Sequence, residues 1–97
     1  MAIAVHLINT PKSDVREAYA AAWDRLDATG NRHPAGRQSH TAWLDGDVLH
    51  VLDVWDSEDD LGKFLESTLG ALLEETGMQL AGPPAIGEFL QTVTAGD

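Results

Sequence analysis

Apolar side chains recur at two different spacings along the chain, and these spacings predict four strands and two helices. Residues 1–9 form a short run rich in Val and Ile, which is typical of a strand buried on both faces. From residue 15 to residue 26 the apolar positions follow helical spacing, with most acidic side chains on the opposite side. A second helical stripe extends over residues 61–73, and residues 86–93 predict a last strand.

Capping residues indicate where both predicted helices begin and end. We expect the first helix to use Thr10 or Ser13 as its cap and to end near Gly30. Ser57 should cap the second helix, because a carboxylate follows three residues later in a capping-box pattern. That helix should end at Gly77, since glycine adopts the left-handed conformation common just after a helix.

Residues 38–55 predict a β-hairpin followed directly by the second helix. Asp45-Gly46 separates two β-rich runs and suits a type I′ turn, so that Leu44 would face Asp47 and the pairing counts outward from there. One face would then carry Gln38, His40, Ala42, Leu44, Leu49, Val51, Asp53 and Trp55. The other would carry Ser39, Thr41, Trp43, Val48, His50, Leu52 and Val54. Neither is a charged, solvated face, so both faces need covering.

The order of elements is strand, helix, strand, strand, helix, strand, within a single domain covering residues 1–97. Right-handed crossovers favour a ferredoxin-like α+β fold, with a four-stranded antiparallel sheet and both helices on one face. We expect the uncovered face to pack against the same face of a second copy, giving a two-fold homodimer. The alternative is a monomer whose sheet is partly exposed.

The charge balance excludes several classes of partner. Sixteen acidic residues stand against six basic ones, giving a net charge of −10, and no basic stretch stands out. Binding to nucleic acid or to an anionic membrane surface is therefore not expected.

The apolar run at residues 2–8 is too short to span a membrane and lacks the basic start and cleavage site of a signal peptide. We therefore expect a soluble, cytoplasmic protein.

A local pattern adds a family resemblance to this topology. Residues 51–67, VLDVWDSEDDLGKFLES, combine a strand ending in Trp, a Ser cap, acidic residues and an amphipathic helix, and an HPAG loop at residues 33–36 precedes His40 on the next strand. With this order of elements the chain resembles the dimeric α+β barrel superfamily, and within it the antibiotic biosynthesis monooxygenase-like proteins. Characterised members include cofactor-independent oxygenases acting on polyketide-type phenols, quinol oxygenases and haem-degrading enzymes.

The resemblance implies a ligand pocket between sheet and helices, and it would place Trp55 at that pocket. In the haem-degrading relatives a histidine on the second helix ligates iron, whereas residues 58–77 contain no histidine here. We therefore expect no haem by that route and no other cofactor. Because this fold hosts oxygenases, isomerases and cyclases, the resemblance indicates an activity only by analogy.

His40 and Asp53 form the most specific candidate site. In the predicted register they lie diagonally, about 7 to 8 Å apart between backbones, on an otherwise apolar face. A carboxylate beside an imidazole fixes its tautomer, which suits proton abstraction from a phenol or an enolisable carbonyl. His40 would be the base, Asp53 its orienting partner and Gln38 a donor to a developing oxyanion; the resemblance adds Trp55 as the wall on which a ring stacks. The alternative is a buried polar pair that sets strand register.

The other histidines give weaker signals. His33 lies in a loop next to Pro34, and loops on rigid scaffolds often carry function, so it is a candidate substrate-binding residue, with an ordinary loop residue as the alternative. No HxH or HxxxH spacing occurs, so no metal site is expected. Together with these candidate residues, the family resemblance implies cofactor-independent monooxygenation or proton transfer on a hydrophobic aromatic or polyketide-like small molecule. The alternatives are a dimer that binds such a molecule without transforming it, and a structural dimer whose histidines only satisfy the interior.

Overall fold

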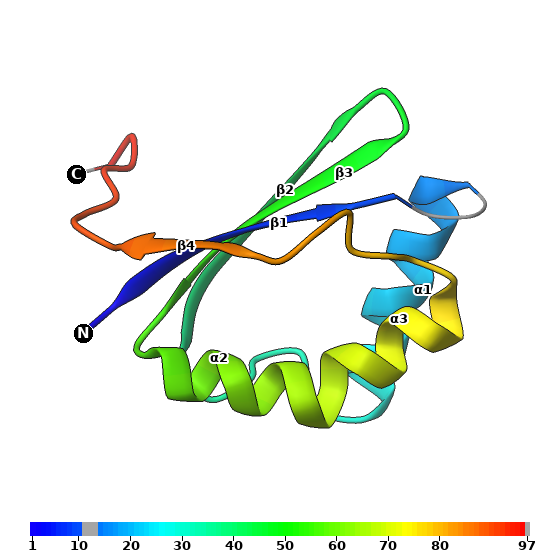
Figure 1. Cartoon of the computed structure of the whole chain (residues 1–97), viewed down its shortest axis with the longest axis horizontal. Coiled ribbons are helices and arrows are strands. Elements are labelled where there is room, and N and C mark those ends of the chain that lie inside the picture. Colours follow the sequence, from blue (N-terminus) through cyan, green and yellow to red (C-terminus); the bar gives the residue numbers. More distant parts are fainter. Residues whose placement is uncertain (11–13, 97) are drawn as a thin grey trace.

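The computed structural model describes residues 1–10 and 14–96, which build a four-stranded antiparallel sheet with the helices packed on one face (Figure 1). The strands are β1 (Ile3–Asn9), β2 (Arg37–Asp45), β3 (Val48–Trp55) and β4 (Ala85–Glu88). Their order across the sheet is β2-β3-β1-β4, and every neighbouring pair is antiparallel. This confirms the predicted ferredoxin-like α+β fold.

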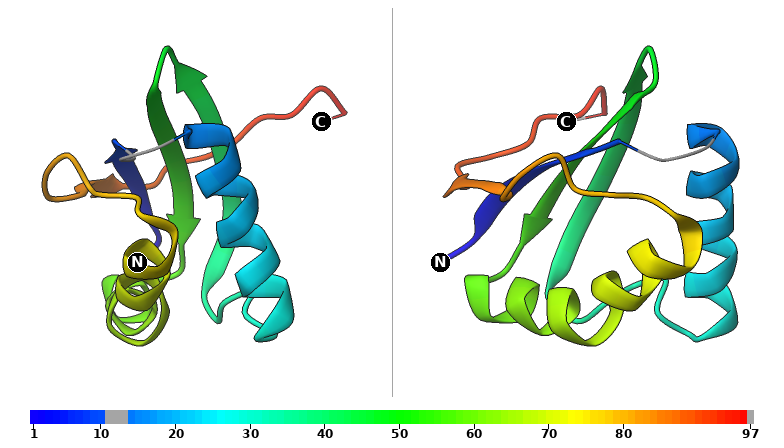
Figure 2. Two further views of the ribbon diagram at one scale, coloured as in Figure 1. Left: turned by 90° about the vertical axis from the view of Figure 1, so that its right-hand side faces the viewer. Right: turned by 45° about the vertical axis from the view of Figure 1, so that its right-hand side comes forward.

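Two helical stretches cover the inner face of the sheet, while the C-terminal segment lies on the other side (Figure 2). Helix α1 spans Val15–Ala28. The second helical stretch has three consecutive parts: α2 (Glu58–Phe64), a π-helical turn η1 (Leu65–Leu69) and α3 (Gly70–Thr76). A π-helical turn inside an α-helix is rare and often occurs at functional sites.

The helix caps agree with prediction at three of the four ends. Ser57 caps α2 by accepting a hydrogen bond from the Asp60 amide, and Gly30 and Gly77 follow the two helices with φ of +75°. At the start of α1, however, the cap is Asp14, whose carboxylate accepts hydrogen bonds from two backbone amides in the first turn of the helix. The expectation of Thr10 was wrong, because Asp14 lies directly before the first helical residue; Ser13 lies outside the described residues.

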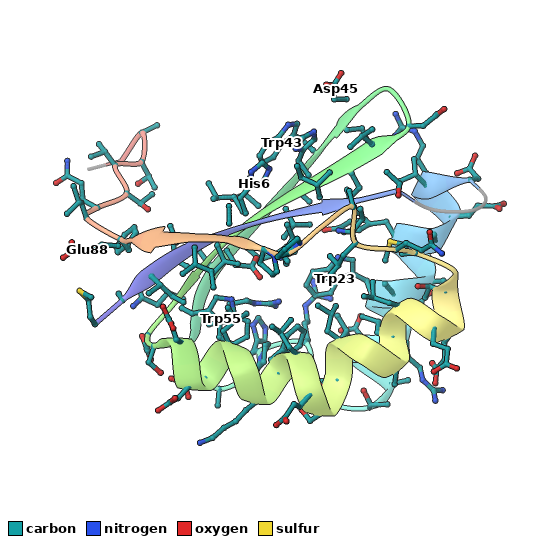
Figure 3. The ribbon with its side chains drawn as sticks, viewed as in Figure 1. His6, Trp23, Trp43, Asp45, Trp55 and Glu88 are labelled. Atoms are coloured by element: carbon teal, nitrogen blue, oxygen red, sulfur yellow. The ribbon has the colours of Figure 1, made fainter. Side chains whose placement is uncertain are left out.

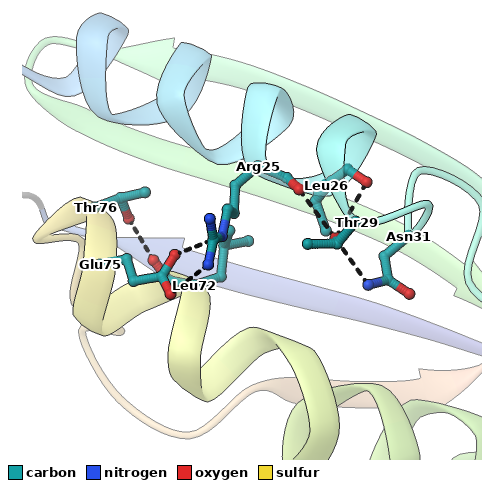
Figure 4. Close-up of polar contacts among 7 residues, drawn as sticks. All are labelled: Arg25, Leu26, Thr29, Asn31, Leu72, Glu75 and Thr76. Atoms are coloured by element: carbon teal, nitrogen blue, oxygen red, sulfur yellow. Dashed lines mark hydrogen bonds and ion pairs between the residues drawn. The ribbon is translucent and has the colours of Figure 1, made fainter.

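A polar contact joins α1 to α3 on the surface. The Arg25 guanidinium lies 2.9 Å from the Glu75 carboxylate (Figure 4). Next to it, the Thr29 hydroxyl donates to the carbonyls of Arg25 and Leu26 and so satisfies the end of α1. Because both charged side chains are about half exposed, this ion pair adds little to stability, at most about 1 kcal/mol.

The hairpin differs from prediction by one residue on each strand. Asp45 pairs with Val48, so the two loop residues are Gly46 and Asp47. Gly46 has φ of +61° and is the only loop residue with positive φ, which matches a turn with glycine in first position rather than the predicted type I′. Because both strands shift together, the predicted division of side chains between the two faces still holds from His40 onward.

The regular alternation is broken at the start of β2. Arg37 pairs with Trp55 and Ser39 pairs with Val54, so Gln38 is the extra residue of a β-bulge. Arg37 therefore takes the inward position that the alternation predicted for Gln38. At the other end of the chain, the strand predicted over residues 86–93 is shorter and ends at Glu88.

The core lies between the inner face of the sheet and the helices. Its strand contribution comes from inward positions of β1 and β3, and α1 adds Val15, Ala18, Ala22 and Leu26. Trp55 and Val5 are completely buried. Full burial of a large apolar side chain stabilises a fold by about 1.5 to 3 kcal/mol. The buried apolar side chains of this core are therefore the main source of stability.

The outer face of the sheet keeps apolar and aromatic side chains in contact with solvent. Trp43 is 44% exposed and Leu52 is 42% exposed. His6 Nε2 lies 3.0 Å from His50 Nδ1, and both imidazoles stack with Trp43. Figure 3 shows His6 and Trp43 on the side of the sheet away from the helices, opposite Trp23 and Trp55.

Candidate functional site

A cavity of about 60 Å³ lies between the sheet and the helices. Most of its wall is aliphatic, from β1, β3, α1, η1 and α3. Polar or aromatic groups interrupt this wall at seven places: Asn9, Tyr19, Trp23, Arg37, His40, Asp53 and Phe64. The predicted pair of His40 and Asp53 therefore lines a cavity and does not face the outer side of the sheet.

His40 and Asp53 are directly opposed on β2 and β3. His40 Nδ1 lies 2.7 Å from Asp53 Oδ1, and Asp53 is only 2% exposed. Because a carboxylate can only accept, Nδ1 of His40 carries the proton, and a neutral ring then presents Nε2 as an acceptor. The one-residue shift of the hairpin thus replaces the predicted diagonal contact with a closer, direct one.

Tyr19 completes a chain of three hydrogen-bonding groups. Its hydroxyl lies 2.9 Å from His40 Nε2 and donates to it, and the two rings stack with centroids 6.3 Å apart. Trp23, one helical turn further along α1, meets the His40 ring edge-on at 5.2 Å. Both aromatic residues belong to the apolar helical stripe that the sequence predicts over residues 15–26. Their spacing of four residues was a signal that they share one helix face, but it could not show which strand they meet.

Arg37 adds a positive charge to the cavity wall. Its side chain donates to the Arg32 carbonyl at 2.7 Å, and its guanidinium lies 5.6 Å from the centre of the Trp23 ring. Burial lowers the pKa of Arg37, and the nearby Asp53 and Tyr19 act in the opposite direction. Arg37 could not be predicted at the site, because no local sequence pattern signals the bulge that turns it inward.

Gln38 and His33 lie outside the cavity, in a surface depression next to it. This depression is lined by Trp23, Arg32, His33, Arg37, Gln38, Ser39 and His40. The Gln38 amide donates to Asp56 at 2.8 Å, and His33 is exposed. The expected position of Gln38 beside His40 inside the pocket is therefore corrected. Trp23, Arg37 and His40 line both spaces and so form the partition between the cavity and solvent.

Trp55 faces the helices as predicted but does not line the cavity. It is completely buried against Phe64, with ring centres 5.3 Å apart, and Phe64 is the residue that reaches the cavity wall. The indole Nε1 is buried and has no hydrogen-bond partner within residues 1–10 and 14–96. In this conformation a ligand in the cavity would meet Phe64 before Trp55.

Gly36 holds the start of β2 against α2. It has φ of +88°, and an added Cβ would overlap the Asp60 side chain. Its carbonyl accepts a hydrogen bond from the Asp56 amide at 2.7 Å. This close approach fixes the chain directly before Arg37.

Two kinds of feature are absent from the described part of the chain. No group of three or more His, Cys, Asp or Glu side chains there is arranged to hold a metal ion. None of its helices combines the length and the apolar character needed to cross a membrane.

Comparison with known proteins gives matches among solved structures only. No protein-family model matches the chain, and no curated protein matches it. SnoaB from Streptomyces nogalater, a cofactor-independent oxygenase, is similar with a TM-score of 0.67 and 18% identity, over 95% of this chain and 96% of that one. A candidate antibiotic biosynthesis monooxygenase from Chloroflexus aurantiacus is similar with a TM-score of 0.69 and 11% identity, over 97% and 98% of the two chains. Another from Deinococcus radiodurans has a TM-score of 0.64 and 13% identity, over 97% of each chain. At these identities the likeness is one of fold.

Proposed function

We propose that this chain, which has the antibiotic biosynthesis monooxygenase-like dimeric α+β barrel fold, deprotonates a hydrophobic aromatic or polyketide-like small molecule in the cavity between sheet and helices, for oxygenation without a cofactor. The observation that carries this proposal is the chain of hydrogen bonds from Tyr19 through His40 to Asp53 at the cavity wall. SnoaB, a cofactor-independent oxygenase of the same fold, supports the reaction class.

Each group in the chain has a role in moving one proton. Asp53 holds the proton on His40 Nδ1, so Nε2 is free to accept a second one. Tyr19 donates to Nε2, and its oxygen keeps a lone pair with which to accept a hydrogen bond from a substrate hydroxyl. The proton can then pass from substrate to Tyr19 while the Tyr19 proton passes to His40.

Arg37 takes the role that sequence analysis gave to Gln38. Deprotonation leaves an anionic, electron-rich phenolate or enolate, and a fixed positive charge in a poorly solvated wall stabilises such an anion. The lowered pKa of Arg37 reflects its burial, yet a guanidinium stays charged at physiological pH.

For a ring methylene, the balanced reaction takes up O₂, places one oxygen on the carbon as a carbonyl and releases the other as water.

Binding requires the cavity to widen. Its volume of about 60 Å³ is well below the roughly 150 Å³ of a cavity that holds benzene. The wall contains Leu69 from the π-helical turn and the partition residues Trp23, Arg37 and His40. We infer that the ligand enters through this partition from the surface depression, where His33 and Gln38 lie on its path.

A second copy of the chain is proposed to cover the outer face of the sheet. Trp43 and Leu52 are each more than two-fifths exposed there, on a face that carries no helix. Apolar side chains exposed on an uncovered sheet face are typical of an interaction surface, and self-complementary packing gives a two-fold homodimer.

The second candidate function is binding of a hydrophobic molecule without transforming it. The mostly aliphatic wall of the cavity supports this function equally well. It differs from the first in requiring no proton transfer by His40.

The test compares wild type with His40→Ala and His40→Gln on a panel of hydroquinones and anthrones. Oxygen uptake and product formation report turnover, and ligand fluorescence reports affinity. We expect both variants to lose turnover, with His40→Gln keeping more of the affinity because it preserves a polar side chain beside Asp53. Thr41→Ser, one residue along on the outer face, is the matched control. Unchanged turnover in both His40 variants would exclude His40 as the base, and binding without turnover in wild type would favour the second function.

A further inference from the structure

Asn9 is a buried polar residue where the strand pattern calls for an apolar one. The inward positions of β1 are Ile3, Val5, Leu7 and Asn9, and all four are buried. Asn9 is 5% exposed and lines the cavity. Its Oδ1 atom is buried, with no hydrogen-bond partner among the residues that the structure describes.

A buried, unpaired amide oxygen destabilises a fold, and a leucine of similar size would avoid that cost. Buried polar groups in proteins almost always have a partner, so an unpaired one in a cavity wall indicates that its partner is a molecule in the cavity. Since the cavity is the proposed substrate site, the partner of Asn9 is to be sought in the substrate.

We propose that Asn9 binds the substrate at the end away from the reacting hydroxyl, by accepting a hydrogen bond from a second hydroxyl or an amine. This inference rests on the proposed function and adds a second polar group to the substrate. The substrate class becomes a fused-ring aromatic compound with hydrogen-bonding groups at both ends.

The sheet register gives the separation of Asn9 from the His40–Asp53 pair, to which the Tyr19 hydroxyl is bound. Asn9 pairs with Leu49, whereas His40 pairs with Asp53. Asp53 lies four positions after Leu49 along β3, which is about 13 Å at roughly 3.3 Å per residue. The inward residues between them are apolar, with Leu7 paired to Val51. A rigid apolar body of about three rings would join the two ends once the cavity has widened.

The test uses 2-hydroxyanthracene and 2,6-dihydroxyanthracene as probes, because they differ only in the hydroxyl at the far end. Binding is measured by ligand fluorescence with O₂ removed, so the readout does not depend on turnover. We expect wild type to bind the diol about three- to tenfold more tightly, as one additional hydrogen bond implies. Asn9→Leu should lose this preference by weakening only the diol, while its thermal midpoint stays the same or rises.

Three controls make the result decisive. Asn9→Met gives a second apolar variant, and the wild-type comparison stands even if both variants fail to fold. Ile8→Val, the next residue on the opposite face of β1, should keep the preference. His40→Gln should also keep it while losing turnover, so a failure of the proposed base and a failure of the Asn9 contact give different results. Equal binding of both probes by wild type, or an unchanged preference in a folded Asn9→Leu, would overturn the inference and leave Asn9 bound to an internal water.

Discussion

His40 Nδ1 and Asp53 Oδ1 lie 2.7 Å apart, on residues directly opposed across the two strands of one hairpin. The backbone register itself brings the two side chains together. Neither flanking loop has to move to form the pair, so it exists before any ligand arrives. A preformed pair of this kind suits a base whose orientation must be correct at the moment of proton transfer.

Replacement of Asp53 by Asn should reduce turnover strongly with little change in shape. The amide has the size of the carboxylate but can donate as well as accept, so His40 no longer has a single preferred tautomer. We expect the turnover number to fall by about 100-fold or more, within the range of general acid–base contributions. Steady-state oxygen uptake measures this, with urea unfolding as the check that the variant is folded. A folded Asp53→Asn protein with wild-type turnover would show that the pair is structural.

Tyr19→Phe tests the outer member of the chain. The phenyl ring can keep its stacking with His40, while His40 Nε2 loses its donor. We expect a loss of about 1 kcal/mol in the free energy of unfolding, typical of one hydrogen bond, and a larger effect on turnover than on ligand affinity. If Tyr19 only fills space, both ligand affinity and turnover should stay at the wild-type level.

Arg37→Met should affect function more than stability. A lowered pKa means that the folded state binds the Arg37 proton less tightly than the unfolded chain does. Keeping Arg37 charged therefore costs stability at every pH below its folded-state pKa, which includes the physiological range. We expect an unfolding free energy equal to or above that of wild type, together with a lower turnover number. Arg16→Met, at an exposed arginine of α1, is the control and should change neither quantity. Marked destabilisation by Arg37→Met would show that its packing on Trp23 outweighs the cost of burying the charge.

Gly36→Ala and Gly62→Ala should shift stability in opposite directions. Gly36 has a positive φ and meets Asp60, so an alanine there should destabilise the fold by about 1 to 2 kcal/mol or more. Gly62 lies within α2 and has open space around it, so alanine should stabilise the helix by up to about 1 kcal/mol. Urea denaturation of both variants measures the difference. Equal shifts would contradict the role given to Gly36 in positioning β2.

The exposure of Trp43 on the outer face predicts that a Trp43→Glu variant will lose the ability to dimerise. A carboxylate at this position would bring a charge into the apolar contact of the proposed homodimer, so the variant should be monomeric at concentrations where wild type is dimeric. Trp43→Phe keeps an apolar ring and should remain a dimer. Size-exclusion chromatography with light scattering measures all three proteins. A monomeric wild type would exclude the homodimer.

The fold and the face of each hairpin residue from His40 onward could be predicted, because both depend on periodicity and on crossover handedness. The position of the turn could not, since Asp45-Gly46 and Gly46-Asp47 both place glycine in a two-residue loop. This difference leaves the face of each of these residues unchanged. It does change the partner of His40, which is directly opposite Asp53 and not diagonal to it.

The site could be predicted only where one hairpin supplies it. His40 and Asp53 are close in the chain, so the strand pattern brought them together. Tyr19 reaches His40 from α1, and the sheet and helix meet in a way that no local spacing describes. Asn9 looked like the end of an apolar run, and its unpaired oxygen is visible only once the neighbouring side chains are in place.

The bulge in β2 decides which of two neighbouring side chains, Arg37 or Gln38, faces the cavity. Arg37 now stands opposite Trp55, and Gln38 is the residue left over. If the irregularity slid by one residue toward Gly36, Gln38 would take that place and Arg37 would turn to solvent. The reacting molecule would then face a neutral amide where a cation had been, with no mutation and no change in the rest of the sheet.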